Sequence, residues 1–141
     1  MSEKNNIIVS CSFSIFSETH DLKFLTQEIG IKPDKEYTIG DVEKEENRFE
    51  RIRFRNGWIL ESIYKDDIEV DVNNIIINIQ NRLFNHLNTI RFLKKEFDLE
   101  IVLTLHIVTN DVGFGYDICY TEIFDLISLV DRFTCFVNFM K

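Results

Sequence analysis

Two stretches of the chain alternate apolar and polar residues with a period of two, which constrains the fold more than any other feature. Residues 99–109 are one of them, with Ile101, Leu103, Leu105 and Ile107 on one face. In residues 7–16 the apolar positions Val9, Cys11, Phe13 and Ile15 alternate with serines. This period is typical of a β-strand with one buried face. The sequence therefore predicts two long strands of a sheet that is covered on one main face.

Stretches with the apolar spacing of a helix lie between these two strands and after the second one. A first helix carries Leu22, Leu25 and Ile29, with Thr19 or Asp21 as its cap and Gly30 and Pro33 ending it. Residues 68–97 also have helical spacing, but a straight helix of this length would run roughly 45 Å, too long for a small domain. We therefore predict a break at the polar residues Asn85, His86, Asn88 and Thr89.

The end of the chain predicts a loop, a helix and a strand. Residues 110–117 have the composition of a loop. Thr121 can cap a last helix, whose inward positions are Ile123, Leu126, Ile127 and Val130. The closing strand alternates through Phe133, Cys135, Val137 and Phe139.

A hairpin is predicted between residues 49–55 and 58–64, because Asn56-Gly57 is a turn signal. A two-residue turn would mix charged and apolar residues on one face. A three-residue loop ending at Gly57 separates the faces. It places Phe54 opposite Trp58, Ile52 opposite Leu60, and Arg51 opposite Glu61, so we expect Trp58 in the core.

These elements predict an α/β protein of the α+β type, formed by residues 1–141 as a single globular domain. The chain has 141 residues, 45% of them hydrophobic, which suits one such domain. The expected architecture is a two-layer sandwich with a mixed, mostly antiparallel sheet of about five strands and about three helices. The order of the strands is left open.

Sequence motifs for catalysis and metal binding are missing. His20, His86 and His106 have no second ligand at metal spacing, and the chain lacks a GxSxG elbow and a phosphate loop. We interpret Gly113-Phe114-Gly115 as a turn. The cysteines Cys11, Cys119 and Cys135 form no CxxC pair and are expected to be buried thiols. We therefore expect no catalytic residue, cofactor or metal.

The charge is unevenly distributed along the chain. The formal net charge is -8, from 16 basic and 24 acidic residues, which makes bare nucleic acid a poor partner. Residues 34–50 are interpreted as an acidic loop and as the candidate partner-binding segment, through Glu36, Asp41, Glu43, Glu45, Glu46 and Glu50. Directly after it, a row of guanidinium groups with period two is the candidate anion-binding site, formed by Arg51, Arg53 and Arg55. A solvated strand face is the simpler interpretation of these arginines.

Several short segments resemble the bacterial domain-of-unknown-function family 4279. They are residues 12–16 (SFSIF), 25–33 (LTQEIGIKP), Gly40-Asp41 and residues 57–62 (GWILES), and the later Gly113-Phe114 loop and closing helix and strand extend the likeness. The sequence departs from that family at Ser17, where a glycine is frequent, and at its Phe139-Met140 ending. The resemblance implies a small cytoplasmic α/β protein and carries no catalytic residue.

Three functional hypotheses follow. The first is a non-enzymatic protein-binding module of a bacterial cytoplasm, of the immunity or antitoxin type, whose partner is basic. The second is a small-ligand-binding or enzymatic domain that uses Arg51, Arg53 and Arg55. The third is a structural homodimer formed through an open sheet edge. The polar N-terminus and the lack of a long apolar run favour the cytoplasm over a membrane.

Overall fold

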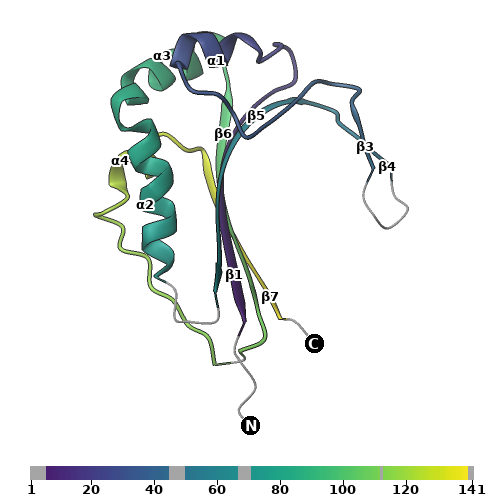
Figure 1. The fold of residues 1–141 in the computed structure, drawn as a ribbon. Coiled ribbons are helices and arrows are strands. Elements are labelled where there is room, and N and C mark those ends of the chain that lie inside the picture. The colour runs from purple at the N-terminus through teal and green to yellow at the C-terminus, as the bar shows by residue number, and fades with distance from the viewer. Residues whose placement is uncertain (1–5, 45–49, 67–70, 112, 140–141) are drawn as a thin grey trace.

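The computed structural model describes residues 6–44, 50–66, 71–111 and 113–139, and its centre is an open five-stranded sheet (Figure 1). Only the β6–β7 pair is parallel, whereas the other neighbours are antiparallel. This mixed sheet and its helices confirm the α+β prediction. The strands lie in the order β2 (Lys35–Tyr37), β5 (Asn56–Asp66), β1 (Ile7–Ser17), β6 (Glu100–Thr109) and β7 (Arg132–Phe139).

Strands β1 and β6 have the faces that their alternation predicts. Phe13 lies between Leu60 and Leu103 in the register, and Ile15 lies between Trp58 and Ile101. All of these side chains are buried in one core. The opposite face of the sheet, called the open face below, carries Ser10, Ser12, Ser14, Thr104 and His106.

The helices cover the other face of the sheet (Figure 1). The predicted break is confirmed, because a 3-10 turn, η1, interrupts the helix where the polar residues occur. None of the helices in the described ranges is long and apolar enough to cross a bilayer. They are α1 (Phe24–Ile29), α2 (Val72–Leu83), η1 (Phe84–His86), α3 (Leu87–Phe97) and α4 (Phe124–Ile127).

The helix ends confirm one prediction and correct two. Gly30 ends α1 with φ of 85°, as its position predicts. Neither Thr19 nor Asp21 caps this helix, because it begins only at Phe24, and Asp21 accepts a hydrogen bond from the Lys23 N–H instead. Thr121 likewise does not cap α4, which has no side-chain cap.

Gln80 of α2 fixes the last helix through one hydrogen bond to the helix backbone and one to the segment just before it. Its Oε1 accepts a hydrogen bond from the Leu126 N–H at 3.1 Å, and its Nε2 donates to the Glu122 carbonyl at 2.8 Å. Because one buried amide satisfies two backbone groups, the segment before β7 is held by α2 rather than by a cap of its own.

The hairpin predicted around Asn56-Gly57 is wrong. Both residues lie inside β5, where Gly57 pairs with Phe16 on one side and with Tyr37 on the other. A Cβ at Gly57 would lie 2.5 Å from the Tyr37 ring, so close packing rather than a turn requires this glycine. Phe54 is exposed, not opposite Trp58, although Trp58 is in the core as predicted.

The loop predicted for residues 34–50 is wrong as well, because it contains β2 and β3 (Val42–Lys44). Strand β3 pairs antiparallel with β4 (Glu50–Ile52), and Arg51 is therefore opposite Glu43 instead of Glu61. The β2–β5 and β3–β4 pairs continue the same register. Residues 38–44 and 50–55, called the arm below, therefore leave the sheet together, on the side away from the helices (Figure 1).

Candidate functional site

A buried asparagine joins the arm to the body of the protein. Asn56 is 4% exposed, and its Oδ1 accepts a hydrogen bond from the Ile39 N–H of the arm at 2.9 Å. Its Nδ2 donates to the His20 carbonyl, in the loop after β1, at 2.7 Å. Because one side chain bonds both segments, the root of the arm, where residues 36–39 and 53–56 join it to the sheet, has a fixed position relative to the end of β1.

Aromatic rings and guanidinium groups pack around this root. The Arg53 Cζ lies 4.1 Å from the centre of the Tyr37 ring, and the Arg55 Cζ lies 3.5 Å from the centre of the Phe16 ring. Such cation–π contacts are worth about 0.5–1 kcal/mol at exposed sites. Arg53 and Arg55 lie between β4 and β5 rather than along one strand, and the side chain of Arg51 is outside the described part. Binding of an anion by these arginines stays a prediction.

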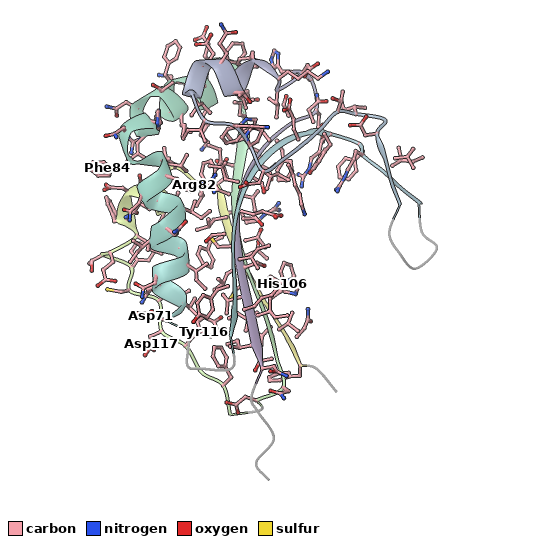
Figure 2. The ribbon with its side chains drawn as sticks, viewed as in Figure 1. Asp71, Arg82, Phe84, His106, Tyr116 and Asp117 are labelled. Atoms are coloured by element: carbon pink, nitrogen blue, oxygen red, sulfur yellow. The ribbon has the colours of Figure 1, made fainter. Side chains whose placement is uncertain are left out.

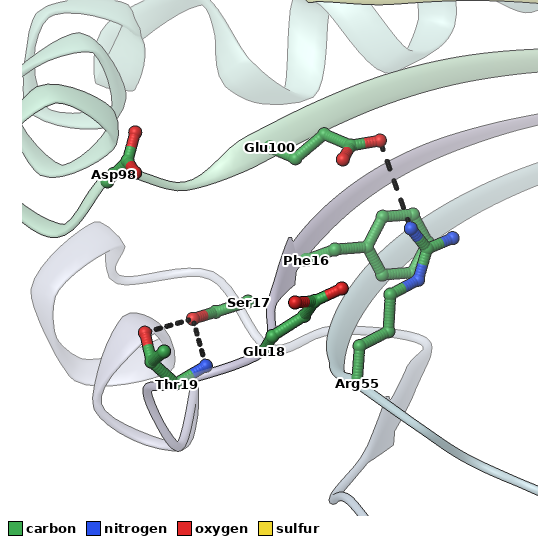
Figure 3. A pocket seen from close by; sticks show the side chains of 7 residues that line it. All are labelled: Phe16, Ser17, Glu18, Thr19, Arg55, Asp98 and Glu100. Carbon is green, nitrogen blue, oxygen red and sulfur yellow. Dashed lines mark hydrogen bonds and ion pairs between the residues drawn. The ribbon is translucent and has the colours of Figure 1, made fainter.

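A hollow of about 320 Å³ lies next to Arg55 (Figure 3). The carboxylates of Glu18, Asp98 and Glu100 line it together with the Phe16 ring. The Arg55 Nη1 lies 3.8 Å from the Glu100 Oε1. Because Glu100 is paired with both Arg55 and Arg132, three carboxylates stand against two guanidinium groups, which leaves a small excess of negative charge around the hollow.

Local backbone structure sets the walls of the hollow. The Ser17 Oγ accepts hydrogen bonds from the N–H groups of Thr19 and His20, at 3.2 and 2.9 Å, and so turns the chain after β1. Asp98 ends α3 in the left-handed conformation, with φ of 51°. Glu100 then begins β6 and also accepts a hydrogen bond from Arg132 at 3.0 Å.

The predicted acidic segment maps onto the arm and its root. Asp41 is exposed on the arm, and its Oδ2 accepts a hydrogen bond from the Thr38 N–H at 2.7 Å. Glu36 is exposed in β2, beside the arm. Glu43 and Glu50 belong to the two arm strands, although their side chains are outside the described part. Glu45 and Glu46 lie outside the described residues.

The arm also carries exposed apolar side chains, which the sequence interpretation missed. Ile52 is 66% exposed and Phe54 is 72% exposed, and Ile39 and Val42 are exposed as well. Val42 and Ile52 are directly opposite in the register, so they project from the same face of the arm. The hairpin prediction places Ile52 and Phe54 on an apolar face opposite core residues, whereas Ile39 and Val42 belong to the segment interpreted as an acidic loop. Exposed apolar groups surrounded by charge are typical of protein interfaces.

The histidines lie apart from one another and make contacts of other kinds. His106 projects from the open face, and its Nε2 lies 2.7 Å from the Asn138 Nδ2 (Figure 2). His20 packs edge-on against Phe97. Within the described ranges, no three histidine, cysteine or acidic side chains come together as a set of metal ligands.

The prediction that all three cysteines are buried is wrong for Cys119 and Cys135. Cys11 is buried as expected, and its burial raises the pKa of its thiol to about 12. Cys119 is half-buried, whereas Cys135 is exposed on β7, with its Sγ 2.7 Å from the Tyr116 hydroxyl oxygen. Cys135 is exposed because β7 lies at the edge of the sheet.

Comparison with known proteins gives a family and no function. A family model described as a domain of unknown function (DUF4279) matches residues 6–120. This span contains the arm and the hollow, and it ends before β7. No curated protein and no solved structure matches the chain.

Proposed function

The chain belongs to the domain-of-unknown-function family DUF4279, whose description names no activity, and from its own structure we propose that it is a non-enzymatic protein-binding module with a basic partner. The observation that carries the proposal is the arm, because it presents Ile52 and Phe54 to solvent among charged residues of both signs. Exposed apolar groups of this kind form the centre of many protein interfaces, with charged groups around them.

The charge of the protein favours a basic partner. The formal net charge of the whole chain is -8, so the preference comes from the chain as a whole. The arm itself is mixed in charge, because Asp41, Glu43 and Glu50 alternate there with Lys44, Arg51, Arg53 and Arg55. Complementary charge accelerates association and disfavours acidic competitors. An immunity or antitoxin-type protein of a bacterial cytoplasm has this task, because it must capture a cationic toxin quickly.

The hollow supports the same proposal. Glu18, Asp98 and Glu100 line the hollow together with the Phe16 ring, which the Arg55 guanidinium covers. A lysine or arginine side chain of a partner would meet the same carboxylates. The alternative is a small-ligand or enzymatic site that uses Arg51, Arg53 and Arg55. We favour it less, because Arg55 is already paired with Glu100, and the carboxylates of Glu18 and Asp98 line the same hollow and disfavour an anion there.

The experiment compares arm and control variants in affinity capture. The chain is immobilised and exposed to an extract of the cells that encode it, and bound proteins are quantified by mass spectrometry. The arm variant is Ile52→Asp with Phe54→Asp. The control is Phe84→Asp with Phe92→Asp, which alters two exposed phenylalanines on the helical layer.

The proposal predicts that the wild type and the control capture the same basic protein. The arm variant should bind it at least about 30-fold more weakly, because truncating an interface hot spot costs about 2 kcal/mol or more. Capture should also weaken with added salt. An identical set of captured proteins on the arm variant would show that the arm does not bind the partner.

A further inference from the structure

Strand β7 is an edge strand without the features that normally protect sheet edges. It pairs with β6 on one side, and in the described part of the chain no strand pairs with its other side. Within Arg132–Phe139 there is no proline and no acidic residue, and Arg132 is the single charge. Soluble proteins usually protect long edges with charges, prolines or bulges, because free N–H and C=O groups pair with other strands.

The apolar side chains of β7 are also exposed. Phe136 is 52% exposed, and Phe139 and Val137 are exposed as well. The opposite edge strand, β2, has three residues and continues into the arm, so β7 is the long edge that is available for pairing. We propose that β7 pairs antiparallel with β7 of a second copy of this chain, so that two sheets join into one.

Charge identifies a second copy as the occupant. Two chains with a net charge of -8 repel each other over most surfaces. Residues 132–139 carry no carboxylate, so the edge of β7 brings two copies together without placing acids opposite each other. A basic partner of the arm would instead gain little from this edge.

Symmetry restricts how the two strands meet. An antiparallel edge-to-edge pair is related by a twofold axis perpendicular to the sheet, and each residue then faces one on the same side of the joined sheet. A register centred on Phe136 pairs Phe136 with its own copy, Phe133 with Phe139, and Thr134 with Asn138. Every phenylalanine of the strand then meets a phenylalanine, and aromatic cross-strand pairs are stabilising.

The inference goes beyond the proposed function and does not depend on it. Strands β2 and β7 are at opposite edges of the sheet, and the arm continues from β2. A dimer through β7 therefore leaves both arms free. Loss of dimerisation and loss of partner capture can consequently be measured separately, with variants of β7 and of the arm.

The first test is the mass of the purified chain in solution, measured by light scattering across a concentration series. The single chain is 16.8 kDa, and the wild type should approach twice this mass as the concentration rises. Phe136→Lys should weaken dimerisation about tenfold or more, because it places two like charges opposite each other. Phe92→Lys, at a residue 63% exposed on α3, is the matched control and should dimerise as the wild type does.

The second test fixes the register by crosslinking under mild oxidation. In a Cys135→Ser background, Phe136→Cys should form a disulfide-linked dimer, because directly opposite Cα atoms lie about 4.5–5.5 Å apart. Phe92→Cys in the same background should not. A mass of one chain at every concentration overturns the proposal, as does a dimer that is unaffected by Phe136→Lys. It is also overturned if the wild type crosslinks through Cys135 while Phe136→Cys in the Cys135→Ser background does not crosslink.

Discussion

Replacing Asn56 by alanine tests whether this residue holds the arm on the body. The substitution removes both hydrogen bonds at the root, to the Ile39 N–H and to the His20 carbonyl. Because Asn56 is buried, water cannot readily replace its amide. The local turn signal of Asn56-Gly57 plays no part in this expectation, since both residues are inside β5.

The expected loss in the free energy of unfolding is about 2–3 kcal/mol. A typical hydrogen bond contributes about 0.5–1.5 kcal/mol net, and a buried group left without its partner costs about 1–3 kcal/mol. Two bonds are lost, and each leaves a backbone group, the Ile39 N–H or the His20 carbonyl, without its partner. Because both bonds are only partly buried, we expect a total loss near the lower end of these costs. For a chain of 141 residues, the melting temperature should fall by roughly 7–10 °C.

Urea unfolding measures this loss through the fluorescence of Trp58, the sole tryptophan, which is buried in the core. Asn88→Ala is the control, because Asn88 only accepts a hydrogen bond from Arg91 at an exposed site, and it should change the free energy by less than about 0.5 kcal/mol. If Asn56→Ala is as stable as this control, the bonds of Asn56 do not fix the root of the arm.

Three further predictions concern packing, pH and thiol reactivity. Gly57→Ala should lower the free energy of unfolding by about 1–2 kcal/mol, because the Tyr37 ring covers Gly57 and leaves no room for a Cβ. In a Tyr37→Ala background the same substitution should cost nothing, which a double-mutant cycle measures. Equal losses in both backgrounds would contradict the packing of Tyr37 on Gly57. Partial burial raises the pKa of Asp131, but bonds from Lys94 and the backbone outweigh it and hold that pKa below its usual value. The stability that Asp131 contributes is therefore present above its unfolded pKa of about 3.9 and is lost as the pH falls through its folded pKa. Asp131→Asn should flatten the acid side of a plot of the urea midpoint against pH. An unchanged slope would refute the role of Asp131. A thiol reagent should modify two cysteines in the folded protein and Cys11 only after unfolding, whereas rapid reaction of all three would contradict its burial.

The sequence predicts those elements whose own pattern decides their structure. The alternation in β1 and β6 identifies the buried face of each strand, and the polar residues near His86 locate the break between α2 and α3. The hairpin fails because Asn-Gly favours a turn only through local backbone preferences. In the folded chain, burial of the Asn56 amide and packing of Tyr37 on Gly57 outweigh those preferences.

The candidate site is predicted in part. The acidic segment is visible in the sequence, because its acidic residues lie close together between Glu36 and Glu50. The hollow is not, because Glu18 is far along the chain from Asp98 and Glu100, and they meet only where β1 ends and β6 begins. Ile52 and Phe54 have the apolar pattern of core residues, and only the tertiary structure reveals that the arm leaves them uncovered.

The most direct test of the central claim is hydrogen–deuterium exchange of the chain, alone and bound to the captured basic protein. Backbone amides in residues 39–44 and 50–55 should exchange more slowly in the complex, together with those around Glu18 at the hollow. The exposed surface of α2 should be unchanged, because it lies in the helical layer on the other side of the sheet and does not line the hollow. Protection of α2 with no change in the arm would contradict the proposal that the arm binds the partner.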